Sequence, residues 1–311
     1  MIEAIKYSGP EEWAEIRSRY IGGSDAAAAI GMDEWKSPFA LWAEKTGRVP
    51  PFGGNLTTKV GGYLEDLVAK LYEEETGKTV RRKNATLVND AYPFACANLD
   101  RVVVGESALL EIKTTNSFPV MRTLRGGEFP DRWLCQMTHY LAVTGMDRAY
   151  LAVLVNCRDF VTFTLERDED EIAALMDAER KFWTLVETDA APGLDGSEST
   201  SEAVKAMWPD ACAEAKDLGR SLTVEFEELA RFKAERKLMD ERIATAENRI
   251  KAAMGDAEAA TCGRWKASWK TQTRRTFQTK EFAAAHRGLD MGPWYKETAS
   301  RVFRVSENKE V

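Results

Sequence analysis

The sequence predicts an α/β protein with a mainly helical C-terminal extension, and three observations support this. Helical and strand-like hydrophobic patterns alternate through residues 1–190, which is typical of one mixed α/β core. Residues 189–201 are rich in proline, glycine, serine and acidic residues and therefore indicate a linker. Residues 224–254 follow a long, highly charged helical pattern. We expect residues 202–311 to form a helical arm followed by a basic, strand-containing extension.

The elements can be predicted in order from hydrophobic spacing and from proline, glycine and acidic end signals. Helices are expected at residues 11–19, 26–30 and 38–47, between Gly62 and Gly77, and at 131–144 and 168–187. Strands are expected at 94–104 and 108–115, joined as a hairpin through residues 105–107, and at 148–157 and 160–165. In the extension, 224–254 should be one arm of a helical hairpin, and 262–277 and 301–305 should be strand-like.

Composition excludes several classes of protein. The 311 residues allow two domains, or one core with a sizeable appendage, and 44% hydrophobic residues are enough for a core. No apolar run approaches the ~18 residues that a membrane span needs. The first ten residues lack the apolar segment of a signal peptide. We therefore expect a cytoplasmic protein with no membrane partner.

Cysteine and histidine content limits the metal chemistry. The five cysteines are scattered and never in CxxC spacing, which disfavours a disulfide framework, a zinc ribbon and an iron–sulfur cluster. Two histidines cannot form a multi-histidine zinc site. If the protein is an enzyme, carboxylates and lysine should do the chemistry. The net charge of −7 argues against non-specific coating of nucleic acid but permits a local basic channel.

Two carboxylates and a lysine form the strongest chemical pattern. Glu111 and Lys113 alternate with Leu110 and Ile112, so they share one face of their strand. Hairpin pairing can bring Asp100 alongside Glu111. Two nearby carboxylates repel each other, and a divalent cation such as Mg²⁺ relieves that repulsion. Such a site suits metal-assisted phosphodiester hydrolysis, with the lysine orienting a water or offsetting charge in the transition state.

A structural interpretation of the same residues is also open. An E-x-K sequence is common in strands, Asp100 can be a turn residue, and Glu111 and Lys113 can form a solvated sheet face. Two further polar residues favour a catalytic site, because Glu65 and Gln136 each lie on a predicted helix at the border of its apolar face. Either can equally be a polar residue at the edge of the core.

Two further patterns suggest anion binding. The Gly22–Ser24 turn precedes a helix, whose N-terminus favours a phosphate, and Arg17 can reach the same anion; such a turn is usually only a cap. In the extension, Trp265, Trp269 and Phe277 are interleaved with basic residues, as a nucleic-acid groove requires. Those basic residues are Arg264, Lys266, Lys270, Arg274 and Arg275. Alternatively, this segment is a solvated strand whose tryptophans pack on the long helix.

The order of these motifs resembles the YqaJ viral recombinase family, which is related to bacteriophage lambda exonuclease within the PD-(D/E)XK nuclease superfamily. The resemblance covers about residues 10–190. The motifs that carry it are Arg17 with Ile21-Gly22-Gly23-Ser24-Asp25, Gly62-Tyr63-Leu64-Glu65, Cys96-Ala97-Asn98-Leu99-Asp100, Leu110-Glu111-Ile112-Lys113 and Gln136-Met137-Thr138-His139-Tyr140. The resemblance implies a restriction-endonuclease-like core, with a central mixed sheet flanked by helices. Leu99 stands where the motif's name has proline.

The resemblance also implies a role for each matching residue. Asp100, Glu111 and the Ile112 carbonyl would ligate Mg²⁺, for which Mn²⁺ would substitute, and Lys113 would activate or position the attacking water. Glu65 would hold a second metal or a metal-bound water. Gln136 and Tyr140 would support the active site and the bound strand. Arg17 and Ser24 would bind a DNA phosphate, including a 5′-terminal one.

The implied function is that of a bacterial or phage-encoded, Mg²⁺-dependent 5′→3′ exonuclease that acts on double-stranded DNA ends. It would leave 3′ single-stranded tails for recombination by strand annealing, with a single-strand annealing protein as partner and a homo-oligomeric ring as assembly. Two alternatives stay open. The same core can be an endonuclease, or a DNA-binding recombination protein without catalysis.

Overall fold

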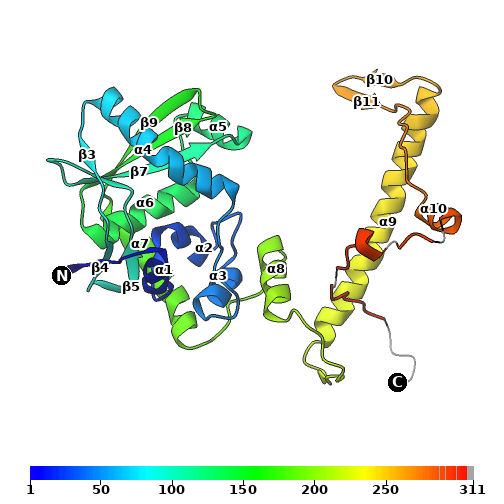
Figure 1. Cartoon of the computed structure of the whole chain (residues 1–311), viewed down its shortest axis with the longest axis horizontal. Coiled ribbons are helices and arrows are strands. Elements are labelled where there is room, and N and C mark those ends of the chain that lie inside the picture. Colours follow the sequence, from blue (N-terminus) through cyan, green and yellow to red (C-terminus); the bar gives the residue numbers. More distant parts are fainter. Residues whose placement is uncertain (287, 291, 299, 307–311) are drawn as a thin grey trace. The chain divides into compact units, whose positions relative to one another are not determined.

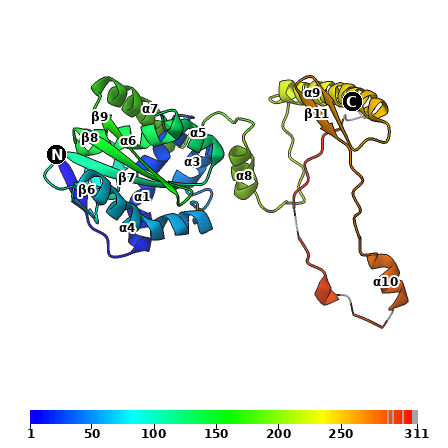
Figure 2. The same ribbon diagram turned by 90° about the horizontal axis from the view of Figure 1, so that it is seen from above.

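The computed structural model describes residues 1–286, 288–290, 292–298 and 300–306. The chain forms two compact units, Met1–Trp208 and Pro209–Val311, which are described separately below. Figures 1 and 2 show the elements of each unit from two directions. Among the described helices, none combines the length and the apolar character needed to cross a bilayer.

A five-stranded mixed sheet is the centre of the first unit. Its strands, in spatial order, are β3 (Val80–Arg81), β6 (Arg101–Val103), β7 (Ala108–Thr115), β8 (Arg148–Val155) and β9 (Asp159–Glu166). Only the β7–β8 pair is parallel, and the chain crosses between these two strands through α5 (Phe118–Arg125) and α6 (Asp131–Thr144). Both central strands are almost entirely buried, as expected for strands covered on both faces.

Helices cover both faces of this sheet. Helix α4 (Leu56–Thr76) packs Val68 and Tyr72 against Leu110 and Ile112 of β7. The opposite face belongs to the larger core, which contains Leu109 together with residues of α6 and α7 (Glu169–Glu187). Alternation along β7 therefore directs Glu111 and Lys113 toward the α6 side, while their neighbours are buried under α4.

A smaller four-stranded sheet lies beside α6. Its order is β1 (Ile2–Ile5), β4 (Thr86–Asn89), β5 (Tyr92–Ala97) and β2 (Ile21–Gly22). Around it lie α1 (Pro10–Ser18), the 3₁₀ turn η1 (Gly23–Asp25), α2 (Ala26–Ala29) and α3 (Pro38–Lys45). The fully buried His139 of α6 bonds to the carbonyl of Cys96 in β5 (2.9 Å) and to Glu179 of α7 (2.9 Å), and so ties three elements together.

The end of the first unit differs from the sequence-based boundary. Within the stretch expected to be a linker, α8 (Glu198–Met207) begins, and it packs against α3. Thr200 is buried there and hydrogen-bonds the Ser37 hydroxyl (2.7 Å). The composition of the stretch concealed this helix, which packs Ala203, Val204 and Met207 against the core in addition to its hydroxyl bond.

Two predicted elements of the first unit are wrong in detail. Gly61 and Gly62 lie inside α4, not before it, because Asn55 caps the helix by accepting a bond from the Thr58 N–H (3.0 Å). The expected strand 94–104 is two strands, β5 and β6, which belong to different sheets. The break between them falls at residues 98–100.

The second unit contains one long helix, α9 (Thr223–Met254), and a two-stranded hairpin of β10 (Ala259–Cys262) and β11 (Trp265–Ser268). A short helix, α10 (Thr279–Ala285), and a 3₁₀ turn, η2 (Gly292–Trp294), follow. The helix was predicted, but it is not one arm of a helical hairpin, since a β-hairpin follows it. The strand expected at 301–305 is also wrong, because these residues have no regular structure.

Candidate active site

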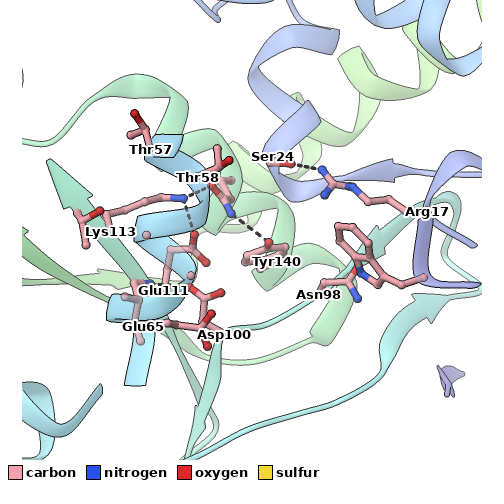
Figure 3. A pocket seen from close by; sticks show the side chains of 17 residues that line it. Arg17, Ser24, Thr57, Thr58, Glu65, Asn98, Asp100, Glu111, Lys113 and Tyr140 are labelled. Atoms are coloured by element: carbon pink, nitrogen blue, oxygen red, sulfur yellow. Dashed lines mark hydrogen bonds and ion pairs between the residues drawn. The ribbon is translucent and has the colours of Figure 1, made fainter. Parts of the chain in front are cut away.

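The β6–β7 register brings the two acids together. Arg101 pairs with Leu110, so Asp100, just before β6, faces Glu111. One Asp100 carboxylate oxygen accepts the Ile112 main-chain N–H at 2.8 Å. Figure 3 shows the two carboxylates side by side. The sequence predicted this juxtaposition from hairpin pairing, although the strand before Asp100 is interrupted.

The electrostatics of the pair are unfavourable without a cation. The Glu111 side chain is buried, and its Oε2 has no hydrogen-bond partner among the described residues. Burial, and then the neighbouring Glu111 charge, raise the pKa of Asp100 well above its ordinary value. A buried, unpartnered carboxylate oxygen is costly, and oxygen ligands of this kind are those that hard divalent cations prefer.

Lys113 links the acidic pair to α6. Its ammonium lies 2.6 Å from Glu111 and donates to the amide oxygen of Gln136 at 2.8 Å. The Gln136 amide nitrogen in turn donates to the Tyr140 hydroxyl at 3.0 Å. Burial, and then the Glu111 and Asp100 charges, raise the pKa of Tyr140 far above its usual value, so its hydroxyl keeps its proton. All four groups form one connected network.

Glu65 lies near the acidic pair, and its charge also raises the pKa of Asp100. Its carboxylate accepts a bond from the buried Arg101, which also pairs with Asp66 at 2.6 Å. In the described part of the chain, no three acidic, histidine or cysteine side chains are grouped as ligands for one metal ion. The donor set that fits a divalent cation is therefore Asp100 and Glu111, with Glu65 on the wall of the same cavity.

A second polar cluster lies across this cavity, which has a volume of about 440 Å³. Arg17 of α1 hydrogen-bonds the exposed Ser24 hydroxyl, and Tyr140 lies between this pair and the acids (Figure 3). Asp25, 5% exposed, holds the cluster through Lys45 (2.9 Å) and Arg17 (3.7 Å). Although burial favours its neutral form, the Lys45 and Arg17 charges lower the pKa of Asp25.

Sequence reasoning missed three supporting residues. Arg101 follows the predicted acid directly, but nothing in the sequence indicates that it pairs with Glu65. Asp25 was named only as part of the Ile21–Asp25 motif, and Lys45 was not named. A signal existed for Lys45, because it ends a helix whose other residues are mostly apolar, and a lysine held among such residues needs an acidic partner.

The basic residues of the extension belong to the second unit and are described by themselves. Arg264, Lys266, Lys270, Arg274 and Arg275 are all exposed. Trp265 is 68% exposed, Trp269 49% and Phe277 64%, so these rings do not form a core against α9. Arg264 lies over the Trp265 ring at 5.0 Å. The alternative that the two tryptophans are buried by packing on α9 is therefore wrong.

Comparison with known proteins assigns the family. The model of the YqaJ-like viral recombinase domain matches residues 12–147. An uncharacterised protein of Bacillus subtilis (strain 168), YqaJ, is 37% identical over 276 residues, which are 87% of this chain and 86% of that protein. The chain belongs to the YqaJ-like viral recombinase family. All five motifs that suggested this family lie within or close to the matched segment.

Structural comparison gives the same fold. An alkaline exonuclease from Laribacter hongkongensis, LHK-Exo, superimposes with a TM-score of 0.51 over 58% of this chain and 94% of that chain, at 22% identity. Its complex with dAMP matches equally well, with a TM-score of 0.51 at 20% identity. The predicted fold class, a mixed α/β core with a mainly helical C-terminal extension, is confirmed, and the core has the fold of this alkaline exonuclease.

Packing at Gly23 gives a stability prediction. A Cβ added at Gly23 would lie 2.3 Å from the Tyr140 ring, whereas one at Gly62 on α4 would meet nothing within 4 Å. We expect Gly23→Ala to lower the free energy of unfolding by roughly 1–3 kcal/mol through overpacking. The matched control Gly62→Ala should raise it by up to about 1 kcal/mol, because alanine favours a helix. Denaturant unfolding followed by circular dichroism measures both; equal stability of the two variants would contradict the close approach.

Proposed function

We propose that this chain is a Mg²⁺-dependent nuclease that degrades double-stranded DNA from its ends in the 5′→3′ direction. The observation that carries the proposal is the pairing of the half-buried Asp100 with the buried Glu111, joined to Lys113 and facing a cavity that Arg17 and Ser24 also line. One side of the cavity suits a metal-dependent cut, and the other suits a phosphate. The family assignment and the names of the LHK-Exo structures, an alkaline exonuclease alone and with dAMP, support the same activity.

The proposed division of labour follows from the contacts. Asp100 and Glu111, with the Ile112 carbonyl, would hold the cation, and Mn²⁺ has the same oxygen preference. When bound, the cation supplies Lewis-acid polarisation of the scissile phosphate and a more acidic water. Glu65, on the same wall, would hold a second ion or a metal-bound water after release from Arg101.

Lys113 and α6 position the nucleophile. An ammonium group has three donors, and Lys113 uses one toward Glu111 and one toward Gln136. The third is left to orient the attacking water and to offset negative charge as it develops on the phosphate. Gln136 fixes the lysine, and the protonated Tyr140 presents a donor to the bound strand.

Removal of Lys113 tests catalysis separately from binding. We expect Lys113→Ala to slow cleavage of a labelled linear duplex by roughly 10³-fold, because a charge that acts in the transition state is lost. Duplex affinity measured in Ca²⁺ should change little. The control variant Lys70→Ala removes an exposed lysine of α4, and it should cleave at the wild-type rate. Near-normal cleavage by Lys113→Ala at saturating Mg²⁺ would overturn the assignment.

The form of the substrate separates the two nuclease interpretations. Relaxed covalently closed circles should resist an enzyme that needs an end, and nicking of these circles by the wild type would establish an endonuclease instead. No metal-dependent cleavage of either substrate would establish a binding protein without catalysis.

The Arg17–Ser24 cluster is proposed to read the 5′ end. A terminal phosphate dianion forms stronger charge-assisted bonds than a hydroxyl, so Arg17→Ala should lose more activity on 5′-phosphorylated duplexes than on 5′-hydroxyl duplexes. Initial rates on the two end types measure this; a difference of roughly tenfold is expected. An equal loss on both ends would reduce Arg17 to an ordinary backbone contact.

The exposed basic hairpin region of the second unit is proposed to contact DNA as well. Its cations can pair with phosphates and its exposed rings can stack on bases. The wider role would be to leave 3′ single-stranded tails for strand annealing, with a single-strand annealing protein as partner and a ring of subunits on the duplex. These last two elements rest on the family resemblance alone.

Salt dependence tests this contact. Replacing Arg274 and Arg275 by alanine should flatten the plot of log affinity against log salt by about one to two units, at ~0.9 per lost phosphate contact. Folding should be unaffected, because both side chains are exposed. Fluorescence anisotropy between low and moderate salt gives the slope. An unchanged slope in a folded variant would assign the segment to another role.

A further inference from the structure

Helix α9 exposes an apolar stripe along most of its 32 residues. Phe232, Met239, Ile243 and Ile250 are each between 51% and 53% exposed, although such residues are usually covered. The stripe repeats every seven residues through two positions per heptad. One position holds Leu222, Leu229, Arg236, Ile243 and Ile250, and the other holds Glu225, Phe232, Met239, Ala246 and Ala253. Glu225 and Arg236 interrupt this repeat and Leu222 directly precedes α9, while the other positions are apolar. A mainly apolar heptad repeat with charged flanks is typical of a coiled coil.

The charges beside this stripe identify the partner. In an antiparallel pair of two α9 helices, Arg236 of each copy packs beside Met239 of the other. Each edge of the stripe then faces the same edge of the second copy. One edge carries Glu228, Glu235, Arg242 and Arg249, and the other carries Lys233 and Asp240. Every charged pair formed in this register joins opposite charges. The pairs are Glu228 with Arg249, Glu235 with Arg242, and Lys233 with Asp240, each formed twice by symmetry.

Other arrangements of the same two helices place like charges together. In a parallel pair, Arg236 faces its own copy in the core and Glu235 faces Asp240. If the antiparallel pair slips by one heptad in one direction, Glu235 meets Glu235 of the other copy. A slip in the opposite direction brings Asp240 against Asp240 and Arg242 against Arg242. One arrangement is therefore free of charge repulsion at the flanking positions.

We propose that two copies of this chain associate through α9, packed antiparallel in this register. The interface is isologous, since each copy contributes the same surface, and it closes on itself as a twofold pair. It uses the second unit only, so it is independent of the nuclease site and of any ring formed by the first unit. Arg236 can extend its guanidinium to the edge of the stripe, where it already approaches Asp240 at 3.7 Å.

A charge-swap series on the full-length chain tests the register. Glu235→Arg alone and Arg242→Glu alone each create two like-charge contacts, so each should weaken self-association roughly tenfold. The double variant E235R/R242E restores both contacts and should recover wild-type association. The matched control Glu241→Arg carries the same charge change on the outer face of α9 and should leave association unchanged. Sedimentation equilibrium gives the dissociation constants, and circular dichroism checks helicity.

The double variant separates pairing from helix stability. Glu235 lies near Arg231 of its own helix (3.8 Å), and this ion pair is lost both in Glu235→Arg and in the double variant. Recovery in the double variant therefore cannot come from within one helix. Three results would each overturn the proposal. The wild-type chain does not self-associate through α9, the single variants associate like the wild type, or the double variant associates more weakly than either single variant.

Discussion

Repulsion between two carboxylates is the constraint around which the first unit is organised. The β6–β7 register places Asp100 opposite the buried Glu111, where water screens the two charges less than it does in bulk solution. The chain offsets part of the cost with the Ile112 N–H and the Lys113 ammonium. One oxygen of Glu111 still has no partner among the described residues, and the pKa of Asp100 is raised. Such a site is poised for a divalent cation.

The surrounding fold holds this unfavourable pair in place. The break between β5 and β6 lets the chain leave one sheet and enter the other at Asp100. Helix α6, which carries the groups that fix Lys113, is fastened by His139 to both β5 and α7. Burial alone would keep His139 neutral, but the Glu179 carboxylate and the Cys96 carbonyl raise its pKa, so an internal ion pair holds the helix.

What the sequence could predict depended on local signals. Gly77 and Gly145 end their helices with positive φ, and the strict alternation of Leu110, Glu111, Ile112 and Lys113 gave the correct face of β7. The acidic pair followed from simple hairpin pairing. The contact of Arg101 with Glu65 did not, because a side-chain bond between residues 36 positions apart leaves no periodic trace.

Prediction was weakest in the second unit for a physical reason. The long, highly charged pattern of residues 224–254 predicted the helix, but a helical pattern does not show which element follows it, and the expected helical hairpin was wrong. The structure provides a β-hairpin after α9 instead, which leaves the stripe exposed over the described residues.

Antiparallel pairing of α9 would also determine where DNA contacts fall. The basic hairpin of β10 and β11 begins directly after the C-terminal end of α9, so a pair of chains carries its two hairpins at opposite ends. A helix of this length spans about 48 Å at 1.5 Å per residue. The two hairpins would then reach phosphates about fourteen base pairs apart along one duplex, at about 3.4 Å per pair. Linked sites bind more tightly than separate ones, so the two hairpins of a pair would hold one duplex more tightly than either hairpin alone.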